Sequence, residues 1–202
     1  ERGMNAVVLD GKDYEGYVNY PSKAKVAVET KAMRQLFVPD LARAKFEILR
    51  RNKPSILFLS RIHYKKGIEV LLRAAAELKT RSVDCVFVIA GTGDADYVAQ
   101  MQKLVSGLGV EDRVEFVGHI GGPLKVSTYQ ACDLFALPTS QENFGFVFPE
   151  SLASGTPVIT TKGVDIWPEL IESGASSIVD CTSAAFADEI QRLLENDELR
   201  RE

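Results

Sequence analysis

The feature that most constrains the fold of this sequence is an alternation of short, largely apolar runs with amphipathic segments from residue 55 onward. The apolar runs have the length of β-strands and lie at residues 56–59, 85–90, 114–117, 133–137, 158–161 and 177–179. Because a strand whose residues are nearly all apolar is buried on both faces, such runs are typical of parallel strands between two layers of helices. The pattern therefore predicts an α/β fold with a doubly wound, mainly parallel sheet and helices on both faces.

The segments between these runs carry apolar residues at helical spacing. Helices are expected at residues 68–78, 97–108, 124–130, 146–154 and 186–194, of which 124–130 has the weakest pattern. In the segment 146–154, Pro149 fits only in the first turn, where a missing backbone N–H costs little. Gly155 suits the position that ends this helix, and Pro157 prevents its continuation.

Residues 1–54 do not show the same pattern. Residues 6–9 are a candidate strand, whereas residues 23–37 and 41–51 look helical but have mixed faces. The sequence thus predicts an N-terminal extension or linker over residues 1–54, followed by one α/β domain over residues 55–202.

The net charge and the number of cysteines indicate which kinds of partner and which cellular compartment to expect. A formal net charge of −4 argues against nucleic acid as the main partner, because phosphate backbones are bound by basic surfaces. No apolar run approaches the ~18–20 residues of a transmembrane helix, and we identify no signal segment. Three cysteines do not form a disulfide framework, so a reducing, cytoplasmic location is expected.

Two cations follow the first apolar run and are candidates for binding an anion. In a doubly wound sheet, ligands bind beyond the carboxyl ends of the strands. Arg61 follows the first expected strand, and Lys66 precedes the helix that comes next. Free N–H groups and the dipole at a helix N-terminus favour the same negative charge as these side chains. Most surface Arg and Lys residues are only solvated, so both interpretations stay open from position alone.

A second candidate segment places two carboxylates around an aromatic stretch. Glu142 precedes the helix expected from residue 146, and Glu150 lies in its first turns. The backbone N–H groups of Gly145 and Phe146 would offer donors to a phosphate, while a carboxylate would accept from sugar or ribose hydroxyls. Carboxylates at a helix N-terminus also simply stabilise the dipole, which is the commoner case. The aromatic residues alternate along the segment at positions 144, 146 and 148, and we expect at least two of them in the core.

Several other functional motifs are absent from the sequence. Gly91 and Gly93 follow a strand, but Asp96 stands where a dinucleotide fingerprint needs a third glycine, so both read as turn residues. His63 and His119 lack carboxylate or cysteine neighbours at zinc-binding spacing, and no metal site is expected. No local nucleophile motif is present.

Four segments carry a family resemblance. They are 58–67 (FLSRIHYKKG), 88–93 (VIAGTG), 114–119 (VEFVGH) and 142–150 (ENFGFVFPE), the last followed by 153–158 (ASGTPV). In this order they resemble family 4 (group 1) retaining glycosyltransferases. The fourth is the most specific and resembles the family's Glu-x7-Glu motif. The resemblance covers about residues 56–180 and implies the C-terminal, nucleotide-sugar-binding domain of a GT-B fold, which is a Rossmann-like unit.

The resemblance also implies roles for individual residues. Arg61 and Lys66 would hold the donor diphosphate and stabilise it as the leaving group, and Glu142 would contact the donor sugar. These three form the implied catalytic set. Glu150 would bind the ribose hydroxyls. The remaining donor-binding residues implied by the resemblance are His119 and Ile120 beside the base, together with Phe144, Gly145, Phe146 and Val147.

The family's chemistry implies further partners. The donor would be a UDP-sugar or a GDP-sugar, and no divalent metal would be required. The acceptor, a carbohydrate or a lipid-linked molecule, would be held by an N-terminal domain that residues 1–54 are too short to form. We therefore expect a domain that binds the donor but is inactive alone. A lipid-linked acceptor would place the full-length enzyme at the membrane periphery.

Two other classes remain as alternatives from the residues themselves. A non-catalytic nucleotide-binding or regulatory α/β module would use the same sheet. Its receiver-type version needs an acidic cluster after the first strand, where this sequence has Ser60 and Arg61. A nicotinamide-dependent oxidoreductase is disfavoured by the incomplete glycine fingerprint.

Overall fold

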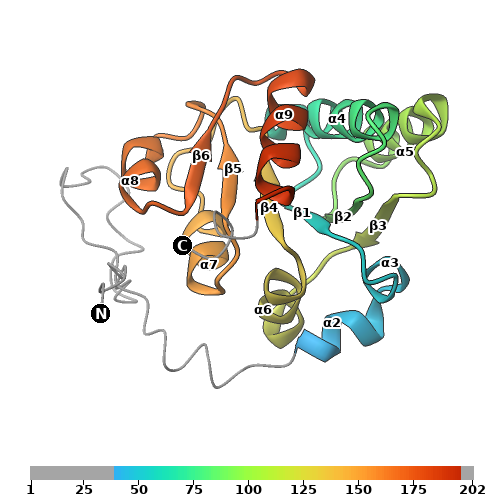
Figure 1. Ribbon diagram of the computed structural model, residues 1–202, viewed down its shortest axis with the longest axis horizontal. Coiled ribbons are helices and arrows are strands. Elements are labelled where there is room, and N and C mark those ends of the chain that lie inside the picture. The colour runs from blue at the N-terminus through green and yellow to red at the C-terminus, as the bar shows by residue number, and fades with distance from the viewer. Residues whose placement is uncertain (1–38, 197–202) are drawn as a thin grey trace.

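The computed structural model describes residues 39–196 and arranges them around one six-stranded sheet (Figure 1). Its strands are β1 (Ser55–Leu59), β2 (Val86–Ala90), β3 (Val114–Gly118), β4 (Leu134–Leu137), β5 (Val158–Thr160) and β6 (Ser176–Ile178). The order across the sheet is β3-β2-β1-β4-β5-β6, and every neighbouring pair is parallel. The predicted doubly wound sheet is confirmed. The expected strand at 6–9 and helix at 23–37 lie outside the described residues.

Burial along the strands follows their place in the sheet. Every residue of β1, β2, β4 and β5 is buried, whereas the two edge strands, β3 and β6, are mostly half-buried. A central strand packs against helices on both faces and has a neighbour on each side, which explains its uninterrupted apolar sequence.

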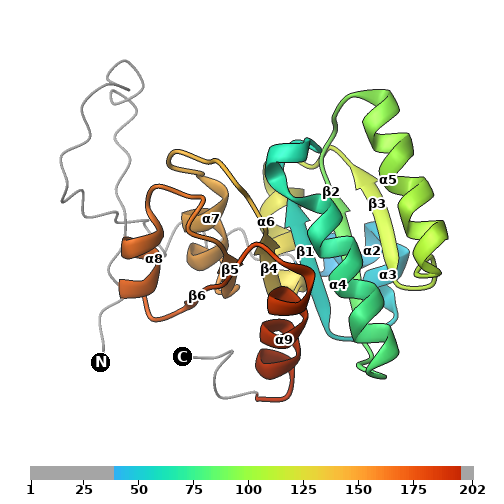
Figure 2. The ribbon, with the colours of Figure 1, turned by 90° about the horizontal axis from the view of Figure 1, so that it is seen from above.

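The helices between the strands form two layers. They are α4 (Ile68–Thr80), α5 (Ala95–Leu108), α6 (Gly122–Ala131), α7 (Val147–Ala153), α8 (Trp167–Glu172) and α9 (Ser183–Leu194). Figures 1 and 2 show α4, α5 and α9 on one face of the sheet and α6 on the other. All five predicted helices are confirmed. The short α8 was not predicted, since its six residues are too few to show a helical period.

The first described helices, α2 (Pro39–Lys45) and α3 (Glu47–Arg50), correct the single helical segment expected over 41–51. The chain breaks at Phe46, which is extended at φ −107° and ψ 125° and is buried. The backbone N–H of Ile48 then donates to the Glu115 carboxylate on β3 at 3.0 Å. Because α2 packs against α6 and α3 against β2, residues 39–50 belong to the packed body. The boundary at residue 54 stays a prediction.

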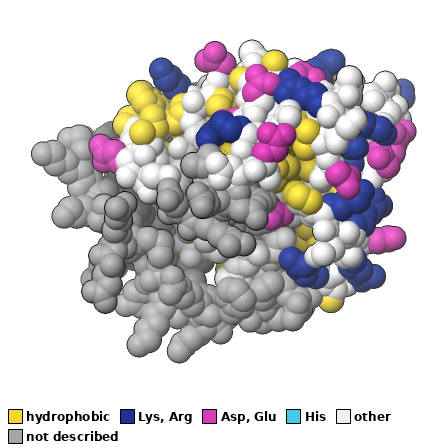
Figure 3. Space-filling model, in the orientation of Figure 1, with side chains coloured by type: hydrophobic (Ala, Val, Ile, Leu, Met, Phe, Trp, Pro, Cys, Tyr) yellow, Lys and Arg dark blue, Asp and Glu magenta, His cyan; other side chains and the backbone are white. Residues whose placement is uncertain are grey.

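Charged side chains of both signs are interspersed over the described part of the face in Figure 3. No continuous basic patch appears there, as the mildly acidic composition leads one to expect. Among residues 39–196 no helix is both long and apolar enough to cross a membrane.

Candidate functional site

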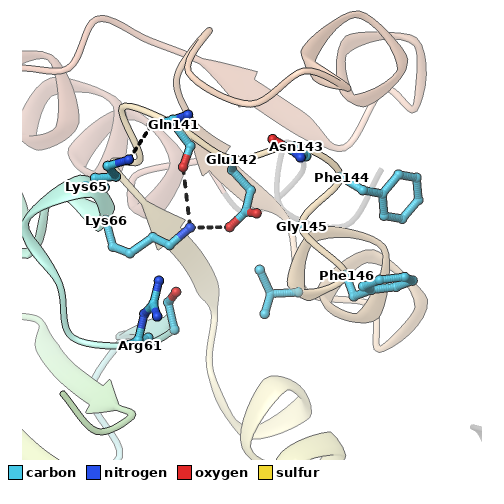
Figure 4. A pocket seen from close by; sticks show the side chains of 11 residues that line it. Arg61, Lys65, Lys66, Gln141, Glu142, Asn143, Phe144, Gly145 and Phe146 are labelled. Atoms are coloured by element: carbon cyan, nitrogen blue, oxygen red, sulfur yellow. Dashed lines mark hydrogen bonds and ion pairs between the residues drawn. The ribbon is translucent and has the colours of Figure 1, made fainter. Parts of the chain in front are cut away.

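The switch point of the sheet lies between β1 and β4, where the strand order reverses. The loops that follow these two strands diverge there and leave a cavity of about 420 Å³, the first cavity (Figure 4). It is lined by Ser60, Arg61, Lys65 and Lys66 from the first loop and by residues 141–147 from the second. The structure thus brings together the two cations after β1 and the first carboxylate after β4, as the sequence predicts.

The loop between β1 and α4 is held against the end of β4. It forms a short 3-10 turn, Tyr64–Lys66, and the backbone N–H of Ser140 donates to the carbonyl of Lys65 at 2.8 Å. Gly67 follows the turn at φ +67°, and a Cβ there would lie 2.0 Å from the carbonyl oxygen of Pro138. Glycine is therefore required where the loop crosses β4, and this crossing places Lys66 in the cavity.

Lys66 is the buried cation of the first cavity, with 9% of the residue exposed. Its ammonium forms an ion pair with Oε2 of Glu142 and lies 3.5 Å from the carbonyl oxygen of Gln141. The Arg61 side chain is exposed and points toward Lys66 in Figure 4. No hydrogen bond or ion pair joins it to another described residue, so its donors are available to a ligand at this cavity.

The backbone of Glu142 is fixed by the loop that follows β5. Its N–H donates to the carbonyl of Gly163 at 2.8 Å, and its carbonyl accepts from the N–H of Asp165 at 3.0 Å. A Cβ on Gly163 would lie 2.3 Å from the carbonyl oxygen of Thr139, so the two loops pack in close contact. No sequence motif marks this support, because it depends on the pairing of β4 with β5.

The turn into α7 orients the aromatic segment. Gly145 has φ +65°, and a Cβ there would lie 2.5 Å from the Phe148 ring and 2.9 Å from Cγ of Glu142. Phe148 and Phe144 are buried, which confirms that at least two of the three rings are in the core. The Phe144 and Phe146 rings are 5.1 Å apart and point away from Lys66 in Figure 4. Pro149 lies in the first turn, as predicted.

A second cavity, of about 400 Å³, lies beyond the carboxyl ends of β1, β2 and β3 and shares Ser60 and Arg61 with the first. Its lining is completed by Leu59, residues 90–93, His119, Ile120 and Lys125. Two anionic or polar parts of one ligand would thus meet at Arg61, with one part in each cavity.

The two glycines of this cavity have a structural role. A Cβ on Gly91 would lie 1.8 Å from the carbonyl oxygen of Ser60, and one on Gly93 would lie 2.1 Å from that of Ile62. Because neither glycine has a side chain, the backbone N–H of Ile62 can donate to the carbonyl of Thr92 at 2.9 Å. This hydrogen bond lies beyond the end of the pairing between β1 and β2. Gly93 forms an isolated parallel bridge with Ile62, so the two glycines allow a close approach of the segments after β1 and β2 and are not turn residues.

Glu150 lines neither cavity and is held from α6. Its Oε2 accepts from the Tyr129 hydroxyl at 3.3 Å and lies 2.5 Å from the Lys125 ammonium. Burial and the Glu150 carboxylate raise the pKa of Tyr129 above its usual value, so the phenol stays protonated and donates. Lys125 connects this carboxylate to the second cavity. The sequence reasoning missed Lys125 and Tyr129, although residues at i and i+4 share one face of a helix.

The histidines occupy different positions. The His63 Nδ1 accepts from the backbone N–H of Lys65 at 3.3 Å and caps the 3-10 turn, while His119 lines the second cavity. Within residues 39–196, no three His, Cys, Asp or Glu side chains are grouped to bind a metal ion. Cys85 and Cys132 are buried.

Fold and site together define a parallel α/β domain with two adjoining cavities at its switch point, which share Ser60 and Arg61. The model of the family "Glycosyl transferases group 1" matches residues 42–202. The alpha-D-kanosaminyltransferase of Streptomyces kanamyceticus is 35% identical over 153 residues, which are 74% of this chain and 38% of that protein. The chain therefore belongs to the group 1 glycosyl transferases.

Solved structures agree with this assignment. The C-terminal domain of the group 1 protein LpcC from Francisella tularensis matches 86% of this chain and 91% of its own, with a TM-score of 0.67 and 26% identity. Anabaena Alr3699/HepE, solved with UDP-glucose, matches 81% of this chain and 44% of its own, with a TM-score of 0.68 and 26% identity. The described sheet is the Rossmann-like half of a GT-B fold. The chain spans less than half the length of the kanosaminyltransferase and of HepE.

Proposed function

We propose that this chain is the donor-binding half of a retaining glycosyltransferase that transfers a sugar from a nucleotide-diphosphate sugar to an acceptor. The observation that carries the proposal is the meeting of Arg61, Lys66 and Glu142 in one cavity at the switch point of the sheet. Two cations match the charge of a diphosphate, and a carboxylate beside them suits sugar hydroxyls.

The bond between the donor sugar and the diphosphate would be cleaved in the first cavity. When the bond between the sugar and the diphosphate breaks, negative charge accumulates on the departing phosphate. Arg61 and Lys66 would stabilise that charge, which is electrostatic catalysis. Glu142 would hold the Lys66 ammonium in place before the donor binds and would contact the sugar afterwards.

The second cavity would take the nucleoside. His119 and Ile120 would border the base, while Glu150 would bind the ribose hydroxyls from the side of Lys125. The sugar and phosphates would lie along residues 144–147, with the Gly145 and Phe146 N–H groups as donors and Val147 near the ribose. HepE was solved with UDP-glucose, which supports a UDP-sugar as the first donor to test, with a GDP-sugar as the second.

The acceptor belongs to the proposal for the whole enzyme. Since the chain spans 38% of the related kanosaminyltransferase, we propose that residues outside this chain bind a carbohydrate or lipid-linked acceptor. The chain alone would bind the donor without transferring its sugar. A cytoplasmic location stays a prediction.

A thermal shift assay tests donor binding. UDP, GDP and ADP are each added to the chain up to millimolar concentration. A nucleotide at about 100 times its Kd stabilises the fold by about 2.7 kcal/mol, and we expect this shift with UDP or GDP. Arg61→Ala should remove most of the shift, because it deletes the side chain shared by both cavities.

Glu150→Ala tests the ribose contact and should weaken binding by about 1–3 kcal/mol, as expected for a charge-assisted hydrogen bond. Lys53→Ala is the matched control, because Lys53 pairs with Asp84 at the opposite end of the sheet. If no nucleotide shifts the unfolding temperature of the parent chain, the proposed donor site is wrong.

A further inference from the structure

The carboxylate of Glu150 has an asymmetric set of contacts. Both the Lys125 ammonium, at 2.5 Å, and the Tyr129 hydroxyl, at 3.3 Å, bind the same oxygen, Oε2. Among residues 39–196 no hydrogen bond reaches Oε1. One oxygen is therefore held by the protein, and the other is left to accept a hydrogen bond from a ligand.

Lys125 differs from an ordinary surface lysine in its surroundings. Its side chain is 26% exposed, compared with 41% and 42% for the lysines of the surface pairs Lys53–Asp84 and Lys79–Asp112. It also lies near the N-terminus of α6, where the helix dipole disfavours a cation. A lysine at this position needs a compensating anion, and Glu150 supplies it.

Tyr129 adds a rigid second donor. The residue is 1% exposed, and its ring packs edge-on against Phe135 of the central strand β4, with centroids 5.6 Å apart. A phenol held by the core fixes the position of Oε2 more firmly than a solvated side chain would.

We propose that Lys125 is a positioning residue for ribose recognition, which with Tyr129 holds Oε2 of Glu150 so that Oε1 accepts from a ribose hydroxyl. This inference rests on the proposed function and extends it, because it assigns discrimination between ribose and deoxyribose to a residue of α6. Lys125 lines the second cavity and so joins the carboxylate to the proposed nucleoside site.

The role is tested by calorimetric titration with UDP and GDP and with their 2′,3′-dideoxy analogues. The parent should bind the better ribonucleotide about tenfold or more tightly than its dideoxy analogue, as expected for a hydrogen bond to a carboxylate. In Lys125→Met this ratio should fall to about twofold, since Oε1 is no longer held in place. Lys125→Arg should retain most of the preference because arginine also pairs with a carboxylate.

Two further variants separate positioning from general damage to the fold. Tyr129→Phe keeps the buried ring but removes the second donor to Oε2, so it should also lower the ratio. It provides the test if Lys125→Met fails to fold. Lys53→Met should leave the ratio unchanged, because its ion pair lies at the other end of the sheet.

The outcomes distinguish this inference from the function on which it rests. If the parent binds neither nucleotide, the proposed donor site itself is wrong. If the parent binds but folded Lys125→Met and Tyr129→Phe keep the parental ratio, the donor site stands and the role of Lys125 is overturned. If Lys125→Met weakens binding of the ribonucleotide and of its dideoxy analogue equally, the role is overturned as well. The lost affinity would then not involve the ribose hydroxyls.

Discussion

Two lysine–glutamate pairs lie at the two ends of segment 142–150, and they differ in burial and in surroundings. In the Lys66–Glu142 pair, the side chains are 11% and 24% exposed, and both residues line the first cavity. In the Lys125–Glu150 pair, the side chains are 26% and 34% exposed, and only the lysine lines a cavity.

The difference shows how the same pair of residue types can serve two purposes. A buried ammonium is costly without a partner, so Glu142 stabilises Lys66, and in the proposed function a diphosphate would take over part of that role. The more exposed Lys125–Glu150 pair has a smaller electrostatic energy and, in our proposal, orients a carboxylate. The two pairs should therefore respond differently to substitution.

The largest expected effect is on diphosphate binding at the buried pair. Lys66→Met should weaken UDP binding about 100-fold, because it removes a charge-assisted contact worth up to about 3 kcal/mol. Titration calorimetry measures the change. Lys79→Met is the control, since Lys79 pairs with Asp112 away from the carboxyl ends of the strands and should bind UDP like the parent. A loss below threefold for Lys66→Met would contradict the assignment.

The backbone that joins the two pairs should be intolerant of a side chain at Gly145. Gly145→Ala should destabilise the fold by about 2 kcal/mol, since it combines a strained φ of +65° with a Cβ 2.5 Å from the Phe148 ring. Urea denaturation gives the free energy of unfolding. The matched control is Gly107→Ala in α5, where a Cβ meets nothing within 4 Å and helix propensity should increase stability. Equal responses of the two variants would refute the strain argument.

The contact of Tyr129 with Glu150 predicts that the free energy of unfolding depends on pH. Burial and Glu150 raise the pKa of Tyr129, so above about pH 10 the native state keeps a proton that the unfolded state has lost. The free energy of unfolding should therefore fall with rising pH, by about 1.4 kcal/mol per unit for this residue. Denaturation of Tyr129→Phe between pH 9 and pH 11 should show a correspondingly shallower slope. An unchanged slope would show that Tyr129 does not titrate as described.

The smallest expected effect is on UDP affinity, which substitutions of the two carboxylates should change in opposite directions. Glu142→Gln should strengthen binding of UDP about threefold, because the positive charge of Lys66 is no longer neutralised. The same variant should lose the extra affinity that the sugar gives to UDP-glucose. Glu150→Gln should instead weaken both ligands, since both contain the ribose. Weaker UDP binding by Glu142→Gln would refute the proposal that Glu142 and the diphosphate both pair with the Lys66 ammonium.

Most of the fold could be predicted from the sequence because the central strands are buried on both faces. The run 56–59 has no polar residue to suggest another structure, and the same reasoning found all six strands. The break in the helix at Phe46 was not predicted. It is followed by a hydrogen bond from the Ile48 N–H to the Glu115 carboxylate, which belongs to a strand far along the chain. Local periodicity carries no information on such contacts.

The candidate site was predictable where position after a strand was sufficient. Arg61, Lys66 and Glu142 meet because β1 and β4 are neighbours, which the doubly wound order implies. The contacts of Glu150 with α6 were not predictable, because they depend on how α6 and α7 pack together. Lys125 carried no motif that would have marked it.

Hydrogen–deuterium exchange with and without UDP-glucose tests the central claim most directly, because it locates the ligand on the chain. We predict protection in residues 60–67, 91–93, 119–125 and 141–150, which are the loops beyond the carboxyl ends of the strands together with the first turns of α6 and α7. Residues 51–54 and 81–85 precede strands at the opposite end and should exchange at the same rate in both samples. Protection confined to those opposite segments, or none at saturating ligand, would contradict a donor site at the switch point.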